Sequence, residues 1–268
     1  KDELARVKTN LLTQMERSFK EKDKTESASY VEEYIRNFLT NEPIPGIEAE
    51  YNYYKQLLPA ITLEEVNAVA NSLKGNNNFA AFVTGPEAAD VKLPSGDDLV
   101  ALVTNTAAKK DIKAYEEKVV TAALFTKELK SGTIVSSVKN EKLGTTTYTL
   151  SNGIKVTIKK TDFKNDQILM GARRFGGTNN YGVEDKYNTT YATQVISAMG
   201  VGAFSPTDLR KALTGKTASV NTVFSPTTDG FSGSSTVKDF ETMLQLLNLY
   251  VYEPRKDTAL FKSFIQKS

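Results

Sequence analysis

Glycines and arginines cluster in the second half of this sequence, where their types could bind an anion. The cluster consists of Gly171, Arg173, Arg174, Gly176, Gly177 and Gly182. A phosphate-binding loop presents backbone amides at a helix N-terminus and usually adds Lys and Ser or Thr at fixed spacing. That spacing is absent here, so the pattern predicts a strand followed by a tight glycine turn.

The chain contains no histidine and no cysteine among its 268 residues. It therefore lacks an imidazole base, a Ser–His or Cys–His pair, and the side chains that most often bind zinc. Without cysteine it forms no disulfide. Any chemistry that this chain performs by itself depends on Asp, Glu, Lys, Tyr, Ser or Thr.

The carboxylates occur mostly as adjacent pairs, such as Glu32-Glu33 and Glu64-Glu65. Adjacent residues of a helix do not face each other, so these pairs favour solvated faces and helix starts. A two-carboxylate glycosidase stays open by residue type, although no spacing supports it. The net charge of +2 gives no electrostatic case for a nucleic-acid partner. No apolar run approaches the length of a membrane span.

Apolar residues recur at helical spacing through the first quarter of the chain and predict four amphipathic helices. These helices are expected near residues 4–19, 27–39, 51–58 and 62–73. Ser27 is expected to cap the second helix, and Thr62 with Glu65 forms a capping box for the fourth. The short apolar run Phe79–Val83 predicts a buried strand.

A change of composition after Thr84 predicts a linker, in which Ile112, Tyr115 and Val119 allow a short helix. Strand and helix patterns then alternate from Gly132 onward, with a hairpin turn at residues 151–153. Strands are predicted over residues 133–138, 145–150, 154–158, 167–175, 216–224 and 230–236. Helices are predicted over residues 187–199 and 240–251, after Ser205, and from Asp257.

The order of several segments resembles the insulinase/pitrilysin-type zinc metallopeptidases, most of all their large bacterial members. In the first half, the segments similar to the second domain of that family are 2–12, the helix capped by Thr62, and 79–86. In the second half, the segments similar to the start of the third domain are Leu150–Val156, Gly176–Thr178, Ser205–Lys211 and Leu246–Pro254.

The resemblance implies an α+β protein with two partial, peptidase-like α/β-sandwich domains, each a mainly antiparallel sheet with helices on one face. Residues 1–86 would be the C-terminal part of one domain, and residues 132–268 the N-terminal part of a non-catalytic one. Residues 87–131 would be a linker with a short helix. Because the first residue is Lys1 rather than Met, we expect an internal piece of a longer protein.

In this family the catalytic domain carries an H-x-x-E-H zinc motif on a helix, and the third domain is a structural copy of the first. Placed on the helix that ends at Met199, the two histidines and the glutamate of the motif fall on Gln194, Ala198 and Ser197. The resemblance therefore implies zinc in the catalytic domain of the complete protein, and no metal-binding or catalytic residue in this chain.

The resemblance also implies what the complete protein does. It would hydrolyse peptides in a chamber, in the periplasm, and this chain would contribute chamber wall and substrate contacts. The turn at Gly176 and Gly177 is a candidate contact, and the partners would be peptide substrates and the remaining peptidase domains. The alternative is a non-catalytic scaffold or partner subunit of the same fold, without an active site anywhere. An H-x-x-E-H motif upstream of Lys1 would separate the two.

Overall fold

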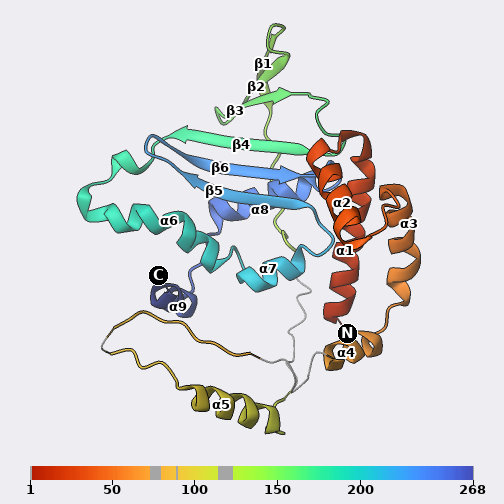
Figure 1. Cartoon of the computed structure of the whole chain (residues 1–268). Helices are drawn as coiled ribbons and strands as arrows, with labels where there is room; N and C mark the ends of the chain where they lie inside the picture. Colours follow the sequence, from red (N-terminus) through yellow and green to blue (C-terminus); the bar gives the residue numbers. More distant parts are fainter. Residues whose placement is uncertain (1, 73–79, 89, 114–122, 268) are drawn as a thin grey trace. The chain divides into compact units, whose positions relative to one another are not determined.

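The computed structural model describes residues 2–72, 80–88, 90–113 and 123–267 (Figure 1). The chain divides into two compact units, one formed by Lys1–Ala60 with Val120–Ser268 and the other by Ile61–Val119. The first unit joins segments from both sides of the predicted linker, and the domain boundaries at residues 86 and 132 stay a prediction.

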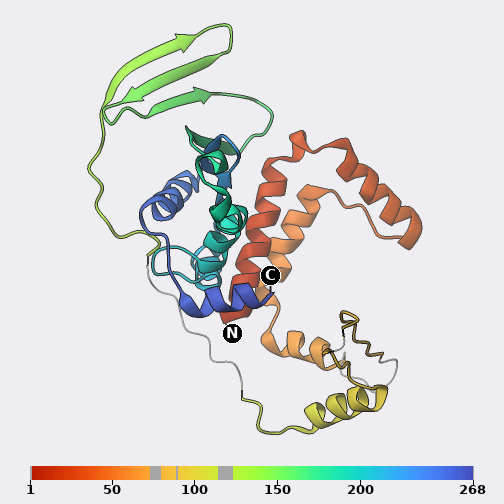
Figure 2. The ribbon, with the colours of Figure 1, turned by 90° about the vertical axis from the view of Figure 1, so that its left-hand side faces the viewer.

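Three helices and two short 3-10 turns build the N-terminal part of the first unit. They are α1 (Asp2–Lys20), η1 (Lys22–Lys24), α2 (Ser27–Thr40), α3 (Ile47–Leu57) and η2 (Leu58–Ala60). Helices α1 and α3 run side by side in both views (Figures 1 and 2). Phe19 stacks on Tyr51 with ring centroids 5.1 Å apart, which holds the end of α1 against α3.

Helix α2 corrects one prediction. It begins at Ser27 itself, and the capping position belongs to Glu26, whose side chain makes no capping hydrogen bond. The helix ends at Thr40 and is capped by Asn41, the only non-glycine residue with positive φ (57°) among the described residues. Its apolar side is largely uncovered, since Phe38 is 84% exposed.

The second unit contains α4 (Leu63–Ser72) and α5 (Gly96–Ala108). The predicted capping box is confirmed, because the Glu65 amide donates to the Thr62 hydroxyl at 3.2 Å and the Thr62 amide donates to the Glu65 carboxylate at 2.7 Å. Helix α5 lies inside the predicted linker and begins at a second capping box, Ser95 with Asp98. Of the short helix predicted in this linker, Tyr115 and Val119 lie outside the described residues.

The strand predicted at residues 79–83 is wrong. Phe79 lies outside the described residues, and residues 80–83 belong to no helix or strand. Phe82 is 86% exposed, so no core covers it. A short apolar run becomes a strand only where another strand satisfies its backbone, and the described residues of the second unit offer none.

The first unit also contains two three-stranded antiparallel sheets, in the orders β1-β2-β3 and β4-β6-β5. The strands are β1 (Ile134–Asn140), β2 (Thr145–Leu150), β3 (Lys155–Lys159), β4 (Ile168–Phe175), β5 (Ala218–Phe224) and β6 (Thr228–Ser235). The predicted hairpin turn is confirmed, with Gly153 at φ 85°. The α+β class is likewise confirmed.

Four helices and two 3-10 turns accompany the second sheet: η3 (Thr178–Asn180), η4 (Val183–Asp185), α6 (Lys186–Met199), α7 (Pro206–Ala212), α8 (Phe240–Tyr252) and α9 (Thr258–Lys267). Helix α8 packs on β5 and β6, and Val220, Met243 and Leu246 form the centre of the core. As predicted, Ser205 caps α7 by accepting from the Asp208 amide at 3.2 Å. In the described part of the chain, no helix combines the length and apolar character that crossing a bilayer requires.

Candidate functional site

Helix α6 carries the positions on which the zinc motif was placed. Its end is set by Gly200, which has φ 81° and follows the fully helical Met199. A Cβ on Gly200 would lie 2.2 Å from the Phe204 oxygen, so only glycine fits this turn. The residues on either side, Met199 and Val201, are buried and anchor the helix end in the core.

The three motif positions do not form a metal site. Gln194 and Ser197 are exposed, and the Ser197 hydroxyl donates to the Thr193 oxygen of the same helix at 2.9 Å. Ala198 has no donor atom to offer. These residues do not fit zinc, which prefers imidazole, thiolate and carboxylate ligands. Elsewhere in the described ranges, no group of three or more Asp or Glu side chains could hold a metal ion.

The turn at Gly176 and Gly177 follows β4 and leads through η3 and η4 into α6 (Figure 1). Two amides at this turn are bonded within the protein: Gly176 donates to the Thr227 oxygen at 3.1 Å, and Thr178 donates to the Ser225 oxygen at 2.9 Å. Gly177 is buried and has φ 86°. The geometry of this turn therefore explains the Gly-Gly pair without any ligand.

An ion pair braces the same turn from the sheet. The Arg174 guanidinium donates to both carboxylate oxygens of Asp229, with Nε–Oδ1 at 2.7 Å and Nη2–Oδ2 at 3.1 Å. This hydrogen bond lowers the pKa of Asp229 and raises that of Arg174. A Cβ on Gly176 would meet the Asp229 carboxylate at 3.0 Å. The sequence pattern singled out Arg174 but missed Asp229, whose partnership appears only in the register that pairs them across β4 and β6.

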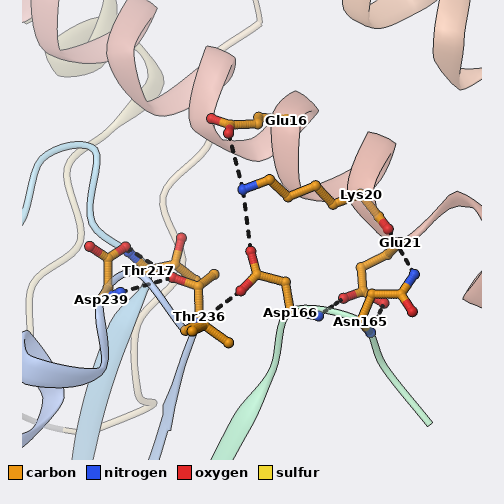
Figure 3. Close-up of polar contacts among 9 residues, drawn as sticks. Glu16, Lys20, Glu21, Asn165, Asp166, Thr217, Thr236 and Asp239 are labelled. Atoms are coloured by element: carbon orange, nitrogen blue, oxygen red, sulfur yellow. Dashed lines mark hydrogen bonds and ion pairs between the residues drawn. The ribbon is translucent and has the colours of Figure 1, made fainter. Parts of the chain in front are cut away.

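A second polar cluster, also missed from the sequence, ties the end of α1 to the start of β4 (Figure 3). The two carboxylate oxygens of Glu21 accept from the backbone amides of Asn165 at 3.1 Å and Asp166 at 2.7 Å. The Asn165 side chain donates in return to the Lys20 oxygen at 2.9 Å. We call this group the α1 clasp.

Asp166 extends the α1 clasp toward the end of β6. One of its oxygens accepts from the Val237 amide at 2.8 Å, and the other pairs with Lys20 at 3.4 Å. Lys20 also pairs with Glu16 at 3.1 Å, and this contact raises the pKa of Lys20. The clasp thus joins residues far apart in sequence through backbone and side-chain groups together (Figure 3).

The α1 clasp leads to a stability prediction. Glu21→Ala should lower the free energy of unfolding by about 1–3 kcal/mol, because two amides lose a charged acceptor. Glu26→Ala is the matched control, since Glu26 is exposed and makes no capping bond; its effect should stay within about 0.5 kcal/mol. Urea unfolding followed by circular dichroism measures both. Equal stability of the two variants would contradict a clasp at Glu21.

No hydrogen bond or ion pair connects the glycine turn with Gln194, Ser197 or Ala198 among the described residues. Along the chain, the two groups of predicted site residues are connected by η3, η4 and α6. The arrangement supplies a rigid strand end, a braced turn and an exposed helix face. It supplies no nucleophile–base pair and no metal ligands.

No family model matches the sequence. A relative from Arabidopsis thaliana, described as "Zinc protease PQQL-like", is 26% identical over 211 residues, which is 79% of this chain and 22% of the plant protein. The chain therefore spans less than a quarter of that relative.

Two solved structures share the fold. The periplasmic protease PqqL from Escherichia coli matches with a TM-score of 0.51 at 22% identity, over 99% of this chain and 29% of its own. A mutant of the ferredoxin protease FusC in complex with Arabidopsis ferredoxin matches with a TM-score of 0.51 at 17% identity. The match covers 90% of this chain and 27% of the FusC chain. The chain is therefore similar in sequence to a segment of a PqqL-like zinc protease, and it shares the fold of a segment of PqqL itself.

Proposed function

We propose that this chain is a non-catalytic portion of a zinc-dependent metalloendopeptidase, in which it contributes chamber wall and substrate contacts. The relationship to a zinc protease supports the peptidase assignment. One observation supports a non-catalytic role. On helix α6, Gln194, Ser197 and Ala198 occupy the positions of the zinc motif, and the chain contains no histidine.

The order of the segments that resemble the peptidase family suggests which domains of the complete protein this chain belongs to. Residues 1–86 form the end of a second domain, residues 87–131 the connection, and residues 132–268 the start of a degenerate third domain. Zinc, bound in another domain of the complete protein, would activate the water that attacks the peptide bond. The residues described here position peptide without taking part in that step. A periplasmic location is proposed because the E. coli relative is a periplasmic protease.

Zinc content and peptide cleavage of the isolated chain test the proposal that it is non-catalytic. After dialysis, the isolated chain should contain no stoichiometric zinc and should not cleave peptides, because it has no His or Cys and no suitable carboxylate group among its described residues. Elemental analysis together with a peptide-cleavage assay measures this. One tightly held zinc ion per chain would overturn the degenerate-domain assignment.

The substrate contact is proposed at the open edge of β4, next to the Gly176-Gly177 turn. Among the described residues, β4 pairs with β6 on one side only and is an end strand of its sheet. An extended peptide can add to such an edge through backbone hydrogen bonds that do not depend on its sequence. Since the Gly176 amide points to Thr227, the alternation of an antiparallel ladder directs the Arg173 amide to the open edge.

Removing that amide tests the proposed contact in the complete protein. Arg173→Pro should lower kcat/KM for peptide hydrolysis by about tenfold, because one hydrogen bond to the substrate is lost. Arg173→Ala, which keeps the amide, is the matched control. Both variants of the 268-residue chain must first show the wild-type melting temperature. Equal kcat/KM for two folded variants would remove β4 from the substrate path.

Peptide hydrolysis by the complete protein distinguishes a metallopeptidase from the scaffold alternative. If the complete protein hydrolyses peptides, and 1,10-phenanthroline removes the activity while added zinc restores it, the metallopeptidase assignment is supported. A complete protein that lacks an H-x-x-E-H motif and shows no hydrolysis would instead be a scaffold or partner subunit.

A further inference from the structure

A pocket of about 350 Å³ lies on the side of α6 that faces away from the motif positions. Val195, Ile196 and Met199 line it, whereas Gln194 and Ser197 point to the opposite side, as the 100° step of an α-helix requires. The volume falls within the range of about 300–1,000 Å³ that is typical of small-ligand sites. The pocket therefore plays no part in the degenerate zinc site.

The walls of this pocket are apolar. Helix α6 supplies the three side chains above, and α9 supplies Phe261, which is 42% exposed. Tyr191 and Phe264 make an edge-to-face pair with ring centroids 6.4 Å apart, and this contact holds α9 against α6. The ring of Phe261 thus remains available to a ligand, while the aromatic pair keeps the two helices in place.

The rim of the pocket is preorganised by the loop between α8 and α9. Arg255 donates to the Met199 oxygen at 3.1 Å and pairs with Asp257 at 2.8 Å. Asp257 in turn accepts from the amides of Ala259 and Leu260, both at 3.0 Å, at the start of α9. These contacts, the Leu260 amide first, lower the pKa of Asp257, so the pair with Arg255 stays charged at neutral pH.

One cation at this rim has no carboxylate partner. Arg255 and Asp257 neutralise each other, whereas Lys256, which is exposed and lines the same pocket, forms no ion pair in the described part of the chain. An apolar pocket with one free ammonium group at its edge complements a ligand that combines an apolar body with a single negative charge.

We propose that this pocket binds the C-terminal residue of a peptide, with an aromatic or branched aliphatic side chain inside and the terminal carboxylate at Lys256. In such a residue the side chain and the carboxylate are attached to the same carbon atom, which suits a pocket whose apolar wall and free cation belong to adjoining elements. The proposal goes beyond the proposed function, because it holds whether or not another domain of the protein cleaves peptides.

The four methionines of the chain provide the assay: Met15, Met170, Met199 and Met243. With methyl-¹³C methionine in the 268-residue chain, N-acetyl-L-phenylalanine should shift the Met199 methyl signal, because Met199 lines the pocket. The other three methyl signals should not move. For a probe of this size, the expected Kd is on the order of a millimolar.

Two comparisons test whether Lys256 binds the carboxylate of the ligand. N-acetyl-L-phenylalaninamide, which lacks the charge, should bind about three- to fivefold more weakly, as expected for a solvent-exposed ion pair. In Lys256→Gln the acid and the amide should bind equally. Thr258→Trp, a substitution at an exposed rim position, should fill the pocket and abolish the Met199 shift for both probes.

Three results would overturn the proposal. The first is an unmoved Met199 signal at about 20 mM probe, well above the expected Kd. The second is equal binding of acid and amide to the wild-type chain, which would leave an apolar hole without carboxylate recognition. The third is a Met199 signal that depends on protein concentration without any probe, which would assign the pocket to contact with a second copy.

Discussion

Gly177→Ala is expected to lower the free energy of unfolding by about 3 kcal/mol or more, or to prevent folding. Gly177 has φ 86°, where a Cβ atom is strained. An added Cβ would also lie 2.3 Å from the Ser225 oxygen and 2.7 Å from the Pro226 oxygen, closer than non-bonded atoms approach. Both atoms belong to backbone that is already hydrogen-bonded to the turn, so neither can move freely.

Two other glycines separate the cost of the backbone strain from the cost of the steric contact. Gly153 has nearly the same φ, 85°, but open space around a Cβ, so Gly153→Ala should cost only the backbone strain of about 1–2 kcal/mol. Gly171 has no positive φ and no atom within 4 Å of a Cβ, so Gly171→Ala should be neutral or stabilise by up to about 1 kcal/mol.

Far-UV circular dichroism in urea measures all three variants, which suits a chain without tryptophan. A cost for Gly177→Ala no larger than that for Gly153→Ala would show that the turn can relax away from residues 225–226.

Asp239→Ala should lower the free energy of unfolding by about 2–4 kcal/mol. The residue is 1% exposed, and one of its carboxylate oxygens accepts from the Thr217 amide at 2.8 Å and the Thr236 hydroxyl at 3.2 Å (Figure 3). The other oxygen lies 3.4 Å from the Lys216 ammonium. Removing the carboxylate leaves the buried Thr236 hydroxyl and the Thr217 amide without this acceptor.

The chain offers graded controls for this prediction. Asp239→Asn keeps one carbonyl oxygen for the Thr217 amide and should cost about 1–2 kcal/mol. Asp162→Asn changes an exposed carboxylate and should stay within about 0.5 kcal/mol. If Asp239→Ala unfolds at the same urea concentration as Asp162→Asn, the buried carboxylate contributes nothing to stability.

The Asp239 carboxylate should also make the free energy of unfolding depend on pH in the acidic range. Burial opposes ionisation of Asp239, but the hydrogen bonds from Thr217 and Thr236 and the nearby Lys216 ammonium outweigh it and lower its pKa in the folded state. The stabilisation is therefore fully present above the ordinary pKa of about 3.9 and is lost as pH falls through the lower, folded pKa. The stability difference between wild type and Asp239→Asn should shrink over that range in urea titrations. A constant difference would contradict the lowered pKa.

Much of the fold could be predicted because its signals are local. The capping box of Thr62 and Glu65, the hairpin turn before Ile154, and Ser205 ahead of α7 all depend on groups within a few residues of one another. The strands from β1 to β6 and the helices from α6 to α9 were likewise readable from periodicity. The resemblance to a zinc protease, inferred from the order of weak segments, is confirmed by the similarity to the plant relative.

The errors have equally specific causes. At Ser27, residue type predicted a cap, but the extended backbone lies one residue earlier, at Glu26. The run at residues 79–83 is apolar enough for a strand, but a strand needs a pairing partner that no local pattern can show. Helix α5 was overlooked because the composition around it favoured a linker, although its Ser95 and Asp98 signal was present.

The sequence by itself determined the α+β class, most element positions, and the absence of any histidine that could bind zinc or act as a base. Only the tertiary structure decided what surrounds each residue: the oxygens of residues 225 and 226 against Gly177, Glu21 on the amides of residues 165 and 166, and Lys256 beside the apolar pocket. The physical reason is distance along the chain. Caps and turns are satisfied by neighbours in sequence, whereas these contacts join segments whose approach depends on how the core packs.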